Sequence, residues 1–151
     1  MFYSIYPRLG IVLLLGTLLL ALWKGGVAER IGACLNVGNA LVTMALHPFL
    51  TPDAAAIATL AFDAVAAVGF LFLAMRYASL WLGAAMLFQA VQFSLHAYYL
   101  VNSLAPDVTH AWINNIDTTG INLAIILGTI TVWRRRARAR IAPAATPGAR
   151  A

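Results

Sequence analysis

The chain has 151 residues, of which 62% are hydrophobic and 10% charged, and its mean hydropathy is +0.84. Soluble globular domains are roughly half apolar and about a quarter charged, so this composition excludes an ordinary soluble domain and favours an integral membrane protein. The length suits one domain, which we divide into a transmembrane helical part at 1–133 and a basic, disordered cytoplasmic tail at 134–151.

The positive charge gathers after the last apolar segment. The formal net charge is +5, and the basic residues of this cluster are Arg134, Arg135, Arg136, Arg138 and Arg140. A basic cluster beside a membrane helix is typical of a topology signal and of contact with anionic lipid. We therefore expect the lipid bilayer, other membrane subunits or further copies of the chain as partners, and no nucleic acid.

Apolar stretches of membrane-spanning length occur five times along the chain. A bilayer core about 30 Å thick takes about 20 helical residues. A backbone in lipid must satisfy its own hydrogen bonds, and strand-like alternation is absent from the sequence, so each stretch is predicted to be a helix. The sequence thus predicts an all-α membrane protein, a bundle of five transmembrane helices near residues 6–23, 30–47, 52–75, 79–102 and 107–133.

Local signals separate these segments. Gly25 and Gly26 end the first, and Pro48 limits the second because proline has no N–H to donate. The third begins at Thr51-Pro52-Asp53, which offers a capping hydroxyl, a proline for the first turn and a carboxylate facing the positive end of the helix dipole. Ala105-Pro106-Asp107 repeats this start signal before the fifth.

The distribution of basic residues gives the bundle a direction. Under the positive-inside rule the C-terminus is cytoplasmic, so an odd number of helices places the N-terminus outside. Of the 10 Lys and Arg residues, only Arg8 then lies on the outer side. The alternative, a cleaved signal peptide at 1–28, leaves four helices and moves the arginine cluster outside. Alanine richness and the preference for arginine over lysine indicate a bacterial protein, located in the inner membrane.

An internal similarity relates the second and third segments to the fourth and fifth. Leu50-Thr51-Pro52-Asp53 resembles Leu104-Ala105-Pro106-Asp107, 54 positions later, and the same offset superimposes Asp63 on Asp117. Such a pattern is typical of parallel repeats in small transporters. Recurrence of a common helix-start signal explains it equally well, so both interpretations remain open.

Polar residues at membrane depth are the candidate functional groups. Asp63 and Asp117 each lie about 16 Å along a helix from its proline, near the bilayer centre, where a carboxylate is costly and indicates an ion or proton site. A structural hydrogen bond between helices is the alternative for each. The helical spacing places further candidates on inward faces of the last two helices: Gln89, Gln92, His96 and Tyr99 in one, and His110 and Asn114 beside Asp117 in the other.

Two histidines suggest a cofactor, although their spacing is not diagnostic. His47 and His96 lie at similar depth on different helices, an arrangement that could hold haem b or, with an aspartate, a metal ion. We nevertheless expect no cofactor, since each histidine also fits an interfacial or structural position. The single cysteine, Cys34, excludes an intramolecular disulfide.

The function suggested first by the sequence is a non-catalytic subunit or assembly partner of a larger membrane complex. No nucleophile, phosphate-loop or metalloprotease motif occurs in the sequence, so we do not expect an enzyme. The alternative is a small proton- or cation-coupled transporter or channel that uses Asp63 and Asp117. A haem or quinone redox module is the third hypothesis.

Overall fold

The computed structural model describes the backbone of residues 5–141 and the side chains of residues 9–141. Within residues 5–141 every regular element is helical. The elements are α1 (Ile5–Lys24), α2 (Val27–Leu46), the short 3₁₀ helix η2 (His47–Phe49), α3 (Pro52–Tyr77), α4 (Leu80–Val101) and α5 (Val108–Ile141). The predicted side of Arg8 and the predicted tail beyond Ile141 lie outside the described residues.

Helix α5 differs most from its predicted range. It continues from the predicted end at 133 to Ile141, so the arginine cluster is helical over residues 134–141 instead of belonging to an irregular tail. The predicted end was placed where the apolar residues end, because hydropathy indicates only the part of a segment that can lie in a bilayer. The helix itself can continue for as long as the residues favour helical structure. Arginine and alanine are both good helix formers, which explains the continuation.

The α1–α2 turn is tight because two glycines allow a close backbone approach. The Gly25 N–H donates to Ala21 O at 2.8 Å, and a Cβ on Gly25 would lie only 2.4 Å from that oxygen. The Gly26 N–H donates to Glu29 Oε2 at 2.9 Å, so the Glu29 carboxylate caps the first turn of α2. The two helices therefore run antiparallel beside each other.

The other helix starts follow their sequence signals, with one difference. Thr51 caps α3 by accepting from the Ala54 N–H at 3.4 Å, and Pro52 is the first residue of the helix. In α5 the cap is Asp107, whose carboxylate accepts from the His110 N–H at 2.8 Å, so Pro106 precedes the cap. The two similar start signals thus adopt different registers, and the internal repeat stays a prediction.

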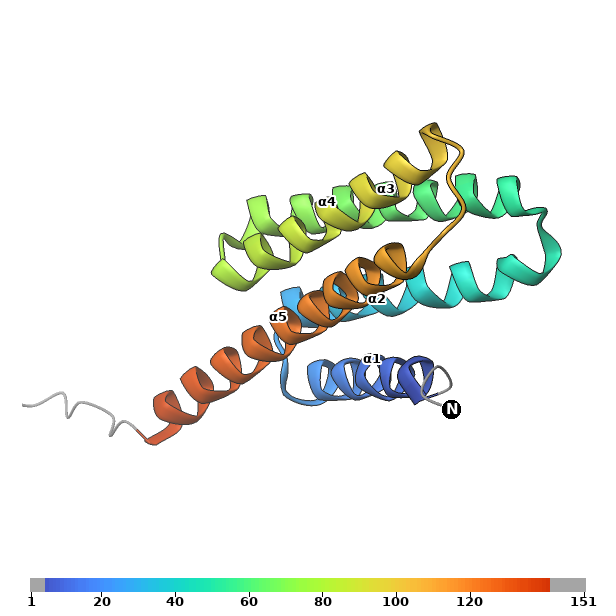
Figure 1. The fold of residues 1–151 in the computed structure, drawn as a ribbon. Coiled ribbons are helices and arrows are strands. Elements are labelled where there is room, and N and C mark those ends of the chain that lie inside the picture. Colours follow the sequence, from blue (N-terminus) through green and yellow to red (C-terminus); the bar gives the residue numbers. More distant parts are fainter. Residues whose placement is uncertain (1–4, 142–151) are drawn as a thin grey trace, which may run out of the picture.

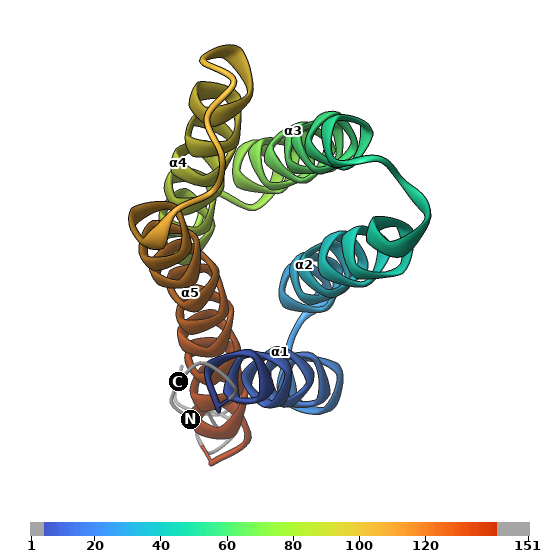
Figure 2. The same ribbon diagram turned by 45° about the vertical axis from the view of Figure 1, so that its right-hand side comes forward.

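The helices pack in chain order, and α5 closes the arrangement. Each helix contacts the next one along the chain, and α5 also contacts α1 and α2. Figure 2 shows the five helices following one another around the bundle, with α5 returning beside α1. In Figure 1 the C-terminal part of α5 extends past the other helices, and its residues from Trp133 onward are exposed.

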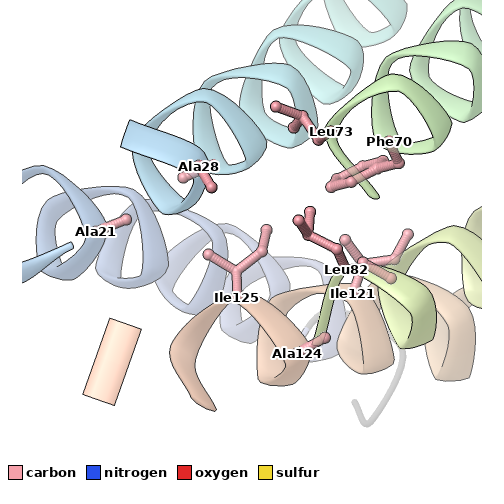
Figure 3. Packing of buried hydrophobic residues seen from close by; sticks show 10 residues of the cluster. Ala21, Ala28, Phe70, Leu73, Leu82, Ile121, Ala124 and Ile125 are labelled. Carbon is pink, nitrogen blue, oxygen red and sulfur yellow. The ribbon is translucent and has the colours of Figure 1, made fainter. Parts of the chain in front are cut away.

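An apolar core lies where the α1–α2 and α3–α4 turns meet the middle of α5 (Figure 3). Phe70, Leu82 and Ile125 are fully buried at its centre. Much of the remaining cluster is alanine, and small residues let helices approach closely, so that van der Waals packing stabilises the contact in an apolar surrounding. The core cluster is Ala21, Ala28, Ala33, Phe70, Leu73, Leu82, Ala85, Ile121, Ala124 and Ile125.

Three helices in the described part of the chain, α3, α4 and α5, are long and apolar enough to cross a membrane. The apolar part of α1, Leu9–Lys24, is shorter. Helix α2 has 20 residues and carries two charged side chains and two asparagines, which lower its hydropathy. Length and composition therefore indicate a helical membrane protein.

The Trp81 indole packs across the α4–α5 contact and makes Gly128 sensitive to substitution. A Cβ on Gly128 would lie 2.6 Å from the indole, whose Nε1 also donates to Glu29 Oε1 at 3.1 Å. Overpacking costs about 1–3 kcal/mol, more than the roughly 1 kcal/mol of helix propensity that alanine adds. We expect Gly128→Ala to lower the midpoint of thermal unfolding in detergent.

Gly83→Ala is the matched control, since Gly83 lies in the same helix as Trp81 and a Cβ there meets nothing within 4 Å. This variant should unfold at the same temperature as the parent or higher. Equal midpoints for the two variants would contradict the packing of Trp81 against Gly128.

Candidate functional site

Asp63 is the centre of a buried polar cluster that joins three helices. Its side chain, in the middle of α3, is 1% exposed. Asn39 Nδ2 of α2 donates to Asp63 Oδ1 at 3.0 Å, and Gln89 Nε2 of α4 donates to the same oxygen at 3.4 Å. His96 Nδ1 of α4 contacts Asp63 Oδ2. The two amide groups donate to the carboxylate, whereas the imidazole can donate or accept, depending on which ring nitrogen carries the proton.

A series of side-chain contacts leads from this cluster to the connection between α4 and α5. The ring of His96 lies 5.1 Å from that of His110, and the ring of His110 lies 4.7 Å from that of Tyr99. The Tyr99 hydroxyl donates to Asp107 Oδ1 at 2.7 Å. Asp107 is exposed in the α4–α5 connection, so titratable and hydrogen-bonding groups extend from the surface to the buried Asp63.

Asp107 is held in its ionised form at the start of this series. The His110 backbone N–H and the Tyr99 hydroxyl both donate to its carboxylate, and these bonds hold the pKa of Asp107 below its ordinary value. The position before the first turn of α5 also favours a negative charge.

Two further amide pairs connect helices near the cluster. Gln92 Nε2 of α4 donates to Asn114 Oδ1 of α5 at 3.2 Å. Asn36 Nδ2 of α2 donates to Asn122 Oδ1 of α5 at 3.3 Å. Polar contacts between helices thus extend from the middle of the bundle toward the α4–α5 connection, whereas the apolar core occupies the other half.

Asp117 is buried beside the cluster without joining it directly. Its side chain is 3% exposed, and its Oδ2 has no hydrogen-bond partner among the described residues. An acceptor oxygen without a donor is costly in a low-dielectric interior, and protonation of the carboxyl is one way to reduce that cost.

The remaining sequence candidates lie away from Asp63. His47 is exposed in η2 and lines a small pocket with residues at the start of α3, and no contact joins it to His96 in the described part of the chain. Among the described side chains, no group of three or more His, Cys, Asp or Glu residues has a geometry able to hold a metal ion. The expected absence of a cofactor, and haem b as the alternative to it, both stay predictions.

The arginine cluster is exposed on the last turns of α5, and one member contacts the bundle. Arg136 Nη1 donates to Gly25 O at 3.2 Å, which ties the end of α5 to the α1–α2 turn. Glu29, 3% exposed at the same turn, bonds to the Trp81 indole. Sequence reasoning did not single out Glu29, although its place three residues after Gly26 is a capping-box signal.

Asn39 is the member of the Asp63 cluster that sequence reasoning missed as a site residue. In the sequence, Asn39 fits close helix packing as well as it fits a functional site, because nothing in the α2 sequence shows which helix its side chain contacts. Only the rotation of α2 against α3 decides that its amide reaches Asp63.

Comparisons with protein-family models, with curated proteins and with solved structures find no match to this chain.

Asp107 should make the start of α5 sensitive to acid. Because its pKa is lowered in the folded state, its stabilising effect is present above the ordinary aspartate value of about 3.9 and is lost as the pH falls through the lower folded value. We expect Asp107→Asn, which retains a good capping side chain, to flatten the loss of thermal stability below about pH 4.

Asp53→Asn is the control for this measurement, since Asp53 lies in the first turn of α3 and is exposed. The parent and the Asp53 variant should keep the steeper pH dependence. An Asp107→Asn variant with the parent's pH dependence would show that the two bonds do not act on this carboxylate.

Proposed function

We propose that the chain is a five-span protein of the bacterial inner membrane that moves protons, or a cation coupled to protons, through Asp63 and His96. The observation that carries the proposal is the direct contact between the buried side chain of Asp63 and the half-buried side chain of His96. Sequence reasoning ranks a non-catalytic subunit first. The contacts of His96 and Gln89 with Asp63 favour the transporter over the subunit, because side chains able to bind a proton lie together at one place in the bundle.

Packing and charge support five spans with the N-terminus outside. Helices α1 and α2 pack in the same bundle as the three span-length helices. Lys24 lies 5.2 Å from the Trp133 ring, and Arg136 bonds to Gly25, so the α1–α2 turn and the basic part of α5 share one end. Helix α3 also ends there with Arg76, and the positive-inside rule assigns this end to the cytoplasm.

The Asp63–His96 pair is suited to holding an exchangeable proton. With one proton between them, the pair is an imidazolium with a carboxylate or a neutral imidazole with a carboxylic acid, and the net charge is zero in both forms. An apolar surrounding tolerates such a pair far better than a lone carboxylate. A second proton leaves the pair as an imidazolium beside a carboxylic acid, and that charge can then be passed on.

The route to this pair favours uptake from the outer side. Asp107, Tyr99 and His110 extend from the exposed α4–α5 connection to His96. On the cytoplasmic side the apolar core around Phe70 and Ile125 closes the bundle. A continuous channel would need polar groups through that half, so a transporter that alternates between two packings fits better than an open channel.

Proton flux into liposomes tests the proposal. The purified protein should move protons faster than protein-free liposomes, and Asp63→Asn, which keeps the size of the side chain, should reduce the rate to that background. Asp53→Asn is the control in the same helix and should retain the parent's rate, because Asp53 is exposed near the helix start. Background flux in the parent, or the parent's rate in Asp63→Asn, would contradict a proton-coupled role.

A subunit or assembly partner is the second candidate, and it too has a specific observation. Both oxygens of Asp63 are occupied by partners from α2 and α4, and the side chain is 1% exposed, as expected for a group that only ties helices together. In that case Asp63→Asn lowers the unfolding midpoint, the parent shows no flux, and native purification recovers a second membrane protein.

A further inference from the structure

A cavity of about 460 Å³ lies between α2 and α3. Its walls are apolar and include Leu35, Val42, Phe62 and Val65. Figure 2 shows these two helices following one another in the bundle, joined by a loop at one end. The cavity is open along one side, so in a bilayer it would face the lipid chains.

A glycine forms part of the cavity wall and keeps it wide. A Cβ on Gly38 would meet nothing within 4 Å, so the space beside this residue is filled by no other part of the described chain. Asn39, the next residue, also lines the cavity and donates to Asp63. The cavity therefore runs beside the polar cluster and is separated from it by one side chain.

An unpaired positive charge lies at one end of the cavity. Arg30 is exposed, lines the cavity and forms no ion pair in the part of the chain with described side chains. The neighbouring carboxylate, Glu29, is already bonded to the Gly26 N–H and the Trp81 indole. The Arg30 guanidinium is thus free to bind an anion from outside the chain, near the end where the basic residues gather.

We propose that this cavity binds one anionic phospholipid of the cytoplasmic leaflet, with the phosphate on Arg30 and an acyl chain along the apolar walls between α2 and α3. From Arg30 to Val42 the wall rises about 18 Å along α2, roughly the depth of one leaflet. Basic pockets between membrane helices on the cytoplasmic side are typical sites for anionic headgroups. The proposal rests on the five-span arrangement, in which α2 lies in the bilayer.

The matching of charge and shape favours a phospholipid over the other occupants. A zwitterionic lipid would fill the apolar walls equally well but would gain little from a guanidinium without a counter-charge. A helix of a partner protein would have to bring an acidic residue to the level of Arg30. Both alternatives give distinct results in a lipid-binding experiment.

Native mass spectrometry of the purified protein with added phosphatidylglycerol or phosphatidylcholine tests the charge requirement. The parent should bind one phosphatidylglycerol more tightly than phosphatidylcholine. Arg30→Gln should weaken phosphatidylglycerol binding about fivefold, since one arginine near an anionic lipid contributes about 1 kcal/mol. Arg76→Gln is the control, because Arg76 is exposed at the same end of the bundle and does not line the cavity.

Gly38→Leu tests the shape requirement in the same experiment. The added side chain enters the open space beside Gly38 and should abolish the tight site, whereas Gly16→Leu, at a position in α1 that is also open and lies outside the cavity, should keep it. Equal affinity for the two lipids, parent-like binding by Arg30→Gln or Gly38→Leu, or a co-purifying protein lost in Gly38→Leu would overturn the proposal. Proton flux is measured separately, so loss of the lipid site leaves the role of Asp63 unaffected.

Discussion

The packing of α2, α3 and α4 is governed by one carboxylate, Asp63, which lies inside a bundle of apolar helices. A group of this kind is costly at membrane depth unless donors or a counter-charge surround it. Asn39, Gln89 and His96 supply them from α2 and α4. Because these partners come from both neighbours of α3, the same contacts that satisfy the carboxylate also fix the packing of three helices.

Two halves of the bundle therefore have different interiors. Toward the basic end, alanines and a few large side chains such as Phe70 and Leu82 form a dry core, and the α1–α2 turn is tied to α5 through Arg136. Toward the α4–α5 connection, amide and imidazole groups replace that packing. A polar group left without a partner in a low dielectric is costly. In the proposed proton transport, a movement of the helices must therefore exchange one set of polar hydrogen bonds for another.

The helices and some of the candidate site residues could be predicted from the sequence, but the physical reasons differ. Pro48 and Thr51 act through the local backbone, so the ends of α2 and α3 were predictable. The spacing of Gln89 and His96 puts them on one face of any helix. The contact between Asn39 and Asp63 depends on how α2 is rotated against α3, and no local sequence pattern encodes this rotation. The helical conformation of the arginines was not predicted, because hydropathy does not show where a helix ends.

We propose that Asp63 and His96 gain and lose a proton together inside the bundle. Infrared difference spectra of the protein in lipid, recorded as the pH is lowered, test it most directly. The claim predicts a carboxylic acid band that Asp63→Asn removes, that His96→Gln shifts in its pH dependence, and that Asp53→Asn leaves in place. A pH-dependent band unchanged in Asp63→Asn, or no such band in the parent, would contradict it.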